Sequence, residues 1–286
     1  LDTNNARQIS DTGSLSGALI GGLMFGIGMV MTRGCASRLL VLSANGNLRA
    51  LLSGLIFAVT AQSALFGVLS PVRLAISSWW TVPGGAARDL LAITGLGHSA
   101  GLAMGGVWLI AALYFSWRSP NRSFWMWVGG IGTGLMVAAA WGFSQWVARE
   151  SFDPVQIQGL TFSGPSAEWL MRVVQWPWPP IGFEFGLMPG VFLGSLIGAL
   201  IGQDWKLEGF TDGYSMRRYI GGAVLMGFGS MLAGGCAVGA GVTGGAIFAL
   251  TAWVSLVGMW AGAGLTDRWL DGGSSAPVKP SQATPQ

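Results

Sequence analysis

Long apolar segments separated by short polar ones constrain the fold of this chain more than any other feature. Charged residues make up only 9% of its 286 residues, which is too few for the exterior of a soluble domain. A helix needs about 20 mostly apolar residues to cross a bilayer. We therefore expect an all-α polytopic membrane protein. Seven segments approach the required length: 15–31, 48–69, 97–117, 124–147, 182–202, 219–232 and 247–265.

The rest of the composition supports this class and excludes several others. The 47 glycines and 15 tryptophans are typical of helices packed closely in lipid, with aromatic belts at the interfaces. The net charge is only +3 and no basic run is present, so we expect a lipid bilayer and no nucleic acid as partner. The chain has no G-x-x-x-x-G-K-[ST] sequence and no nucleophile at a recognisable spacing from its single histidine. We therefore expect no cofactor, no ATP coupling and no enzymatic activity.

Short apolar pieces lie between the candidate spans. They are too short to cross a bilayer and cover residues 36–44, 72–80, 86–94 and 237–243. Backbone other than spanning helix is tolerated at membrane depth only where protein or a water-filled cavity covers it. The pieces therefore predict glycine-broken and re-entrant short helices around a central path.

A polar segment at residues 150–180 divides the apolar chain roughly in half. We place it at one membrane surface, with a short interfacial helix that begins after Ser166 as N-cap. The chain then has an N-terminal segment, a transmembrane domain of two halves joined by the polar segment, and a disordered C-terminal tail. Their bounds are 1–14, 15–265 (halves 15–149 and 181–265) and 266–286.

Basic residues predict the orientation of the chain. Arg118 and Arg122 lie in one loop, and Lys206, Arg217 and Arg218 lie in another, two spans further on. The two loops therefore face the same side. Cytoplasmic loops carry an excess of lysine and arginine, so we expect this side and the C-terminus to be cytoplasmic.

The two halves contain a repeat centred on the only two cysteines. At an offset of 201 residues, "GGLMFGIGMVMTRGCA" (21–36) lies over "GAVLMGFGSMLAGGCA" (222–237). After a small gap, Asn45-Gly46 falls near Gly244-Gly245. Matching broken helices in two halves point to the central site of a transporter. The matched pairs are Gly21 with Gly222, Gly26 with Gly227, Gly28 with Gly229, Gly34 with Gly235, and Cys35 with Cys236.

A helix broken within the membrane suits an anion. The half-helix after the break starts with unpaired N–H groups and the positive end of a helix dipole. A cysteine there adds a polarisable S–H group for a soft partner. The candidate substrate path therefore contains Gly34, Cys35, Gly235 and Cys236. The alternative is that these small residues serve only close helix packing.

Arg33 and Arg38 flank Cys35, but glycines occupy the aligned positions in the second half. Both arginines are candidates for the substrate path, because a charge within the membrane is expensive and usually serves a purpose. The alternative is that they lie near a surface, or bond the carbonyl groups that the break exposes.

Three blocks of the chain resemble the signature blocks of the YeeE/YedE family of bacterial inner-membrane proteins. They are "GLMFGIGMVMTRGCASRLLVLSANGNLRALLSG", "SFDPVQIQGLTFSGPSAEWLM" and "LMGFGSMLAGGCAVGAGVTGG". The resemblance implies a pseudo-twofold, hourglass-shaped helical bundle that takes up a sulfur compound, with thiosulfate the best-supported substrate. It also implies that Cys35 and Cys236 line the central constriction and hand the ion along through S–H···S contacts. A cytoplasmic sulfur-carrier protein is the implied partner.

The chain departs from the family pattern in one respect. Family members that transport thiosulfate carry a third important cysteine, and this chain has none to match it. A related anion, or a sulfur- or selenium-containing relative of thiosulfate, therefore stays open as substrate.

The leading hypothesis is a permease or channel-like carrier of a small sulfur-containing anion such as thiosulfate. The alternative is a membrane thiol-based sulfur relay or redox protein, in which Cys35 and Cys236 form a disulfide or carry a persulfide. Arg33 would favour the thiolate that such chemistry needs. A non-transporting scaffold would leave the repeated Gly-Cys breaks unexplained.

Overall fold

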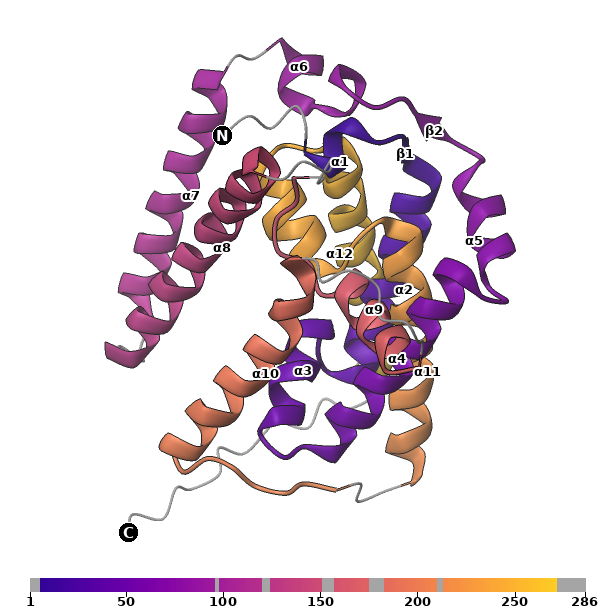
Figure 1. Ribbon diagram of the computed structural model, residues 1–286, viewed down its shortest axis with the longest axis vertical. Coiled ribbons are helices and arrows are strands. Elements are labelled where there is room, and N and C mark those ends of the chain that lie inside the picture. The colour runs from indigo at the N-terminus through magenta and orange to yellow at the C-terminus, as the bar shows by residue number, and fades with distance from the viewer. Residues whose placement is uncertain are drawn as a thin grey trace.

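Helices make up most of the chain in the computed structural model (Figure 1). The structure describes residues 6–95, 98–119, 124–150, 157–174, 183–209 and 213–271. Each of the seven predicted spans corresponds to one helix of 18 to 27 residues. These helices are α2 (Leu15–Thr32), α4 (Leu48–Phe66), α7 (His98–Arg118), α8 (Phe124–Glu150), α10 (Phe183–Ile201), α11 (Gly213–Ala233) and α12 (Leu250–Asp271).

Short elements connect the long helices, as the pattern of short apolar pieces predicts. The piece at 36–44 is confirmed as a helix with the same bounds. Two strands pair antiparallel, with Gly13 opposite Val82, and form the one sheet among the described residues. The short elements are α1 (Arg7–Ser10), β1 (Gly13–Ser14), α3 (Ala36–Ala44), α5 (Ser70–Ser77), β2 (Thr81–Val82), the 3₁₀-helix η1 (Ala86–Arg88), α6 (Leu90–Thr94), α9 (Ser163–Val174) and the π-helix η2 (Gly239–Gly244).

Four described segments are long and apolar enough to cross a bilayer, judged by length and composition. They are α2 together with α3, then α4, α7 and α8. The apolar side chains of α7 and α8 are largely exposed, for example Trp108 and Leu135. Both helices extend away from the central bundle in Figure 1. Exposed apolar helices of this length suit lipid rather than water, so the chain is a multi-pass membrane protein.

Glycines hold the central bundle together. α2 packs against both α11 and α12, and α11 packs against α4. A Cβ added to Gly28 would lie 2.5 Å from the Gly222 carbonyl oxygen, and one added to Gly21 would lie 2.6 Å from that of Gly229. The backbones of α2 and α11 therefore touch directly. Helices in lipid associate through close contact of this kind, because burying apolar surface gives them little advantage over lipid tails.

A buried arginine ties the N-terminal segment to the bundle. The Arg88 guanidinium donates to the Asp11 carbonyl and to the Thr251 hydroxyl of α12, the latter over 2.6 Å. Burial lowers the pKa of Arg88, and the Asp11 charge partly opposes this. Because an arginine stays charged in proteins, these hydrogen bonds compensate a buried charge. The segment before α2 is therefore anchored to the start of α12.

Three boundaries differ from the sequence-based predictions. α11 begins at Gly213, so Arg217 and Arg218 lie in a helix and not in a loop. α12 runs to Asp271, so residues 266–271 continue the helix, and the predicted tail from 272 lies outside the described residues. The prediction of Ser166 as N-cap is wrong: α9 begins at Ser163, and the Ser166 hydroxyl bonds the Phe162 carbonyl within the first turns.

The direct backbone contact predicts that Gly28→Ala destabilises the bundle. Its methyl group has to separate α2 from α11, and overpacking a tight contact costs about 1–3 kcal/mol. The midpoint of thermal unfolding in detergent should fall. Gly105→Ala in α7 is the matched control, because a Cβ there meets nothing within 4 Å. Equal midpoints for the two variants would contradict the close packing.

Candidate functional site

The first helix break follows α2. Arg33 has left-handed backbone with φ 57°, and the N–H of Gly34 donates to the Met29 carbonyl over 3.0 Å. A left-handed residue after the last helical one ends many helices in this way. Cys35 follows in extended conformation, and its carbonyl accepts the N–H of Leu39 over 2.9 Å as the first bond of α3.

The second break has the same local geometry. Gly234 is left-handed with φ 78°, and the N–H of Gly235 donates to the Ser230 carbonyl over 2.9 Å. The Cys236 carbonyl accepts the N–H of Ala240 over 2.8 Å. Each of these three features also occurs at the first break, 201 residues earlier in the chain. Both cysteines therefore stand at the start of a short helical segment.

The left-handed residue of each break stands directly before the glycine of the Gly-Cys pair. It is Arg33 before Gly34 in the first half and Gly234 before Gly235 in the second. The bonds that close α2 fix this position, because Thr32 is its last residue and the Thr32 hydroxyl lies 2.8 Å from the Gly28 carbonyl oxygen. Arg33 thus has a backbone conformation that glycine adopts more easily.

The second turn of the repeat also differs from the alignment. Gly46 is left-handed with φ 95°, and its counterpart by geometry is Phe248 with φ 56°. Gly245 is helical with φ −65°. The helices that follow these turns, α4 and α12, both begin two residues after the left-handed residue.

The two thiols have different polar neighbours. Cys35 is half-buried, and its Sγ lies 3.2 Å from the Ser37 hydroxyl. Cys236 is 1% exposed, and its Sγ lies 4.0 Å from the hydroxyl of Thr161, which in turn lies 3.3 Å from that of Ser163. The sequence does not indicate Thr161 and Ser163. They belong to the polar segment at residues 150–180, and no local pattern predicts that they lie near Cys236.

One apolar cluster brings the two breaks together. Cys236 is a buried member of it, and Cys35 packs against it as a partly buried member. Phe25 of α2 and Met226 of α11 lie in the same cluster. Neither cysteine forms a disulfide. The structure therefore places both thiols around one core as free groups.

The two flanking arginines are exposed at the first break. Among the described residues, Arg33 and Arg38 have no carboxylate or hydrogen-bonding partner. The stem of Arg38 covers Gly34, since a Cβ added there would lie 3.2 Å from its Cδ. The carbonyls at the end of α2 are bonded by a different arginine: Arg218 of α11 donates to Met31 over 3.1 Å. Arg33 and Arg38 thus remain available to an anion.

The start of α3 carries unpaired backbone donors. Its N-cap residue, Cys35, makes no capping hydrogen bond through its side chain. Within the described part of the chain, the N–H groups of Ala36, Ser37 and Arg38 have no acceptor. Such groups at the positive end of a helix attract anions. Donors, thiol and cations therefore gather at the first break.

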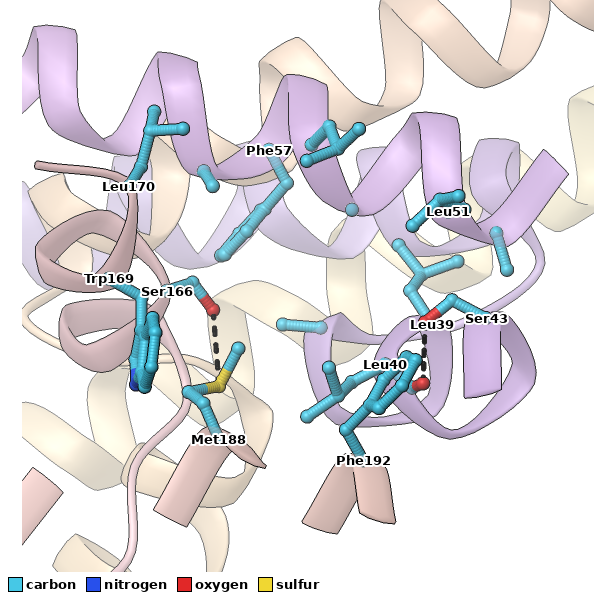
Figure 2. A pocket seen from close by; sticks show the side chains of 15 residues that line it. Leu39, Leu40, Ser43, Leu51, Phe57, Ser166, Trp169, Leu170, Met188 and Phe192 are labelled. Atoms are coloured by element: carbon cyan, nitrogen blue, oxygen red, sulfur yellow. Dashed lines mark hydrogen bonds between the residues drawn. The ribbon is translucent and has the colours of Figure 1, made fainter. Parts of the chain in front are cut away.

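A separate cavity of about 290 Å³ lies between α3, α4, α9 and α10. Figure 2 shows its apolar lining, which includes Leu39, Phe57, Trp169 and Phe192. Its polar groups already have partners: Ser43 bonds the Leu40 carbonyl, and the Trp169 indole bonds the Phe185 carbonyl. Apart from the N–H of Ala36, which belongs to the break at Cys35, this lining offers no free donor and therefore does not suit an oxyanion. We therefore place the candidate site at the cysteines and not here.

No group of three histidine, cysteine or acidic side chains in the described ranges lies close enough together to hold a metal ion. The site consists of thiols, hydroxyls, backbone donors and arginines. These groups donate hydrogen bonds and positive potential, and they suit a small anion with a soft atom.

Comparison with known proteins gives a consistent result. The model of a family described as sulphur transport matches residues 4–265. The thiosulfate transporter TsuA of Escherichia coli is 32% identical over 137 residues, which are 48% of this chain and 36% of that protein. The thiosulfate transporter TsuA of Spirochaeta thermophila is 24% identical over 269 residues, 86% of this chain and 76% of that protein. The first match thus spans little more than a third of its relative's length.

The left-handed turns predict opposite effects of glycine exchange at the two breaks. Arg33→Gly relieves a backbone conformation that disfavours a side chain by about 1–2 kcal/mol, so the unfolding midpoint should stay equal or rise. Gly234→Ala imposes that strain and should lower the midpoint. Thermal unfolding of both purified variants checks this, and a fall with Arg33→Gly would contradict the turn geometry.

Proposed function

Since the chain belongs to the sulphur transport (YeeE/YedE) family, we propose that it carries a small sulfur-containing anion of the thiosulfate type across a membrane. The observation that carries this proposal is the pair of free thiols, each at a helix break and both around one cluster. The proposed protein is a permease or channel-like carrier and not an enzyme.

The chemistry of the breaks supports an anion with a sulfur end. The N–H groups at the start of α3 and the positive helix end attract oxyanion oxygens. An S–H group is a weak donor, which suits a soft terminal sulfur that must bind and then leave. In this proposal Cys35 and Cys236, with Gly34 and Gly235 beside them, line the central constriction. Arg33 and Arg38 supply positive potential at the Cys35 side.

Reciprocal contacts support a molecule of two pseudo-symmetric halves. Gly21 contacts Gly229 and Gly28 contacts Gly222, and the sequence repeat pairs Gly21 with Gly222 and Gly28 with Gly229. Each contact is therefore the repeat of the other. In the same way, α12 packs on α2 and α4 packs on α11. We propose halves at 15–149 and 181–265, with α3 and the segment around η2 as re-entrant helices.

The packing directions support one consistent topology. Gly22 lies against Ser255 and Gly26 lies against Met259, so α12 runs parallel to α2. The end of α12 therefore lies on the same side as Arg33, and this side also holds Lys206 and the start of α11. By the positive-inside rule, we propose that this side and the C-terminus are cytoplasmic, in a bacterial inner membrane.

The identity of the anion and of its acceptor belongs to the proposal as well. This chain has two cysteines, so the third cysteine of the thiosulfate-transporting members has no counterpart. Thiosulfate is the first substrate to test, followed by its selenium-containing relatives. A cytoplasmic sulfur-carrier protein is the proposed acceptor on the inner side.

A thiol-based sulfur relay is the second candidate function. Cys35 is half-buried and forms no disulfide, so its thiol is open to a sulfur donor. The intact mass of the purified protein under non-reducing conditions separates the two functions. A carrier should have the mass of the free dithiol, whereas an added sulfur atom or the loss of two hydrogens would favour the relay.

The carrier predicts that Cys35→Ala and Cys236→Ala each reduce uptake of radiolabelled thiosulfate into proteoliposomes. Loss of a hydrogen bond to a charged ligand costs about 1.5–3 kcal/mol, which corresponds to roughly tenfold or more in rate. Ser53→Ala is the control, because Ser53 is a buried small residue of α4 whose hydroxyl has no hydrogen-bond partner among the described residues. Normal uptake by the double cysteine variant would overturn the proposal.

A further inference from the structure

Each thiol has a hydroxyl neighbour, but the two hydroxyls come from different places in the chain. Ser37 stands two residues after Cys35 in the same turn, with its hydroxyl 3.2 Å from Sγ. The aligned residue after Cys236 is Val238, which has no hydroxyl. Thr161 of the polar segment at residues 150–180 supplies a hydroxyl instead, 4.0 Å from the Cys236 Sγ. A polar group at each thiol is thus retained although the sequence repeat does not supply it.

The Thr161 hydroxyl lies within hydrogen-bonding distance of a second hydroxyl, and either oxygen can be the donor of that bond. Ser163 is 3% exposed, and its Oγ lies 3.3 Å from that of Thr161. When Ser163 donates to Thr161, the single proton of Thr161 points elsewhere. The distance of 4.0 Å to Sγ leaves that proton only weakly engaged by the thiol. In that arrangement a donor is available beside Cys236.

Gly239 leaves room for this arrangement. A Cβ added to Gly239 would lie 2.8 Å from the Thr161 hydroxyl oxygen and 4.0 Å from the Cys236 Sγ. Any side chain at position 239 therefore meets the hydroxyl on the side that faces the thiol. Gly239 also begins the π-helix η2, a rare form of helix that occurs frequently at functional sites.

We propose that Thr161 is a specificity-determining residue of the substrate path, backed by Ser163. Its hydroxyl donates a hydrogen bond to an oxygen of a sulfur oxyanion while the terminal sulfur of that anion contacts the Cys236 thiol. The Thr161 hydroxyl and the Cys236 thiol then recognise the two ends of a thiosulfate-type ion, an oxygen and a sulfur. This inference rests on the proposed function, because it assumes that such an ion passes Cys236.

The test compares three variants and one control variant in uptake assays with radiolabelled thiosulfate. Thr161→Val keeps the shape but removes the donor, and it should raise the KM for thiosulfate about tenfold. Thr161→Ser restores the donor and should return the KM close to that of the wild type. Gly239→Ala should act like Thr161→Val, whereas Gly241→Ala serves as control, since its Cβ would make only an ordinary contact of 3.4 Å with Leu256.

A second measurement detects binding without transport. Thiosulfate should raise the midpoint of thermal unfolding of the purified protein, because a ligand that binds only the folded state stabilises it. Thr161→Val should need about tenfold more thiosulfate for the same shift, while its midpoint without thiosulfate stays unchanged. A purely structural role would change that midpoint in the absence of the anion.

The outcomes separate the two levels of the proposal. Wild-type protein that takes up no thiosulfate in vesicles and shows no shift of its unfolding midpoint with thiosulfate would overturn the proposed function together with this inference. Wild-type uptake with an unchanged KM in Thr161→Val would overturn the inference alone. Equal losses in Thr161→Val and Thr161→Ser would do the same, because they indicate packing. If Thr161→Val does not reach the membrane, the comparison of Gly239→Ala with Gly241→Ala decides.

Discussion

The direct backbone contact between α2 and α11 is the interaction on which the rest of the structure depends. In lipid, apolar side chains gain little by leaving the tails for one another, so contact distance and shape determine which helices stay together. Gly28 against Gly222 and Gly21 against Gly229 remove the side chains that would separate the two backbones. The two helices that carry the cysteine breaks are thereby fixed to each other. The position of Cys35 relative to Cys236 is therefore set by this antiparallel pair of helices.

A helix break within such a bundle leaves backbone groups that need partners, because apolar surroundings offer none. At the end of α2 the structure provides several: the Gly34 N–H bonds Met29, the Thr32 hydroxyl reaches Gly28, and Arg218 bonds Met31. The carbonyl side of the break is therefore well satisfied. The donor side, at the start of α3, is not. This imbalance is what makes the break attractive to an anion rather than to a cation.

The sequence predicts the parts that depend on local pattern. Apolar length and glycine spacing predict the long helices and the bounds of α3. They do not place the left-handed residue at Arg33, because an arginine in that conformation is set by the closing bonds of α2 and not by its own preference. The sequence also does not predict that Thr161 lies beside Cys236, since 75 residues separate them. Charge predicts a loop at Arg217 and Arg218, whereas both lie in α11 and Arg218 bonds carbonyls of α2 from within that helix.

The two thiols share a backbone geometry and differ in surroundings, and this difference has a physical consequence for a carrier. Cys35 is half-buried beside exposed cations and unpaired N–H groups, whereas Cys236 is buried with only hydroxyls as polar neighbours among the described side chains. Positive potential concentrates an anion but also slows its release. Neutral hydroxyl donors replace part of the hydration shell while adding no net charge. On the proposed function, the anion is therefore held more strongly at the Cys35 side than at Cys236. On the same proposal the two cysteines have different tasks: passage at Cys236, and a stronger hold at Cys35 on the side proposed as cytoplasmic.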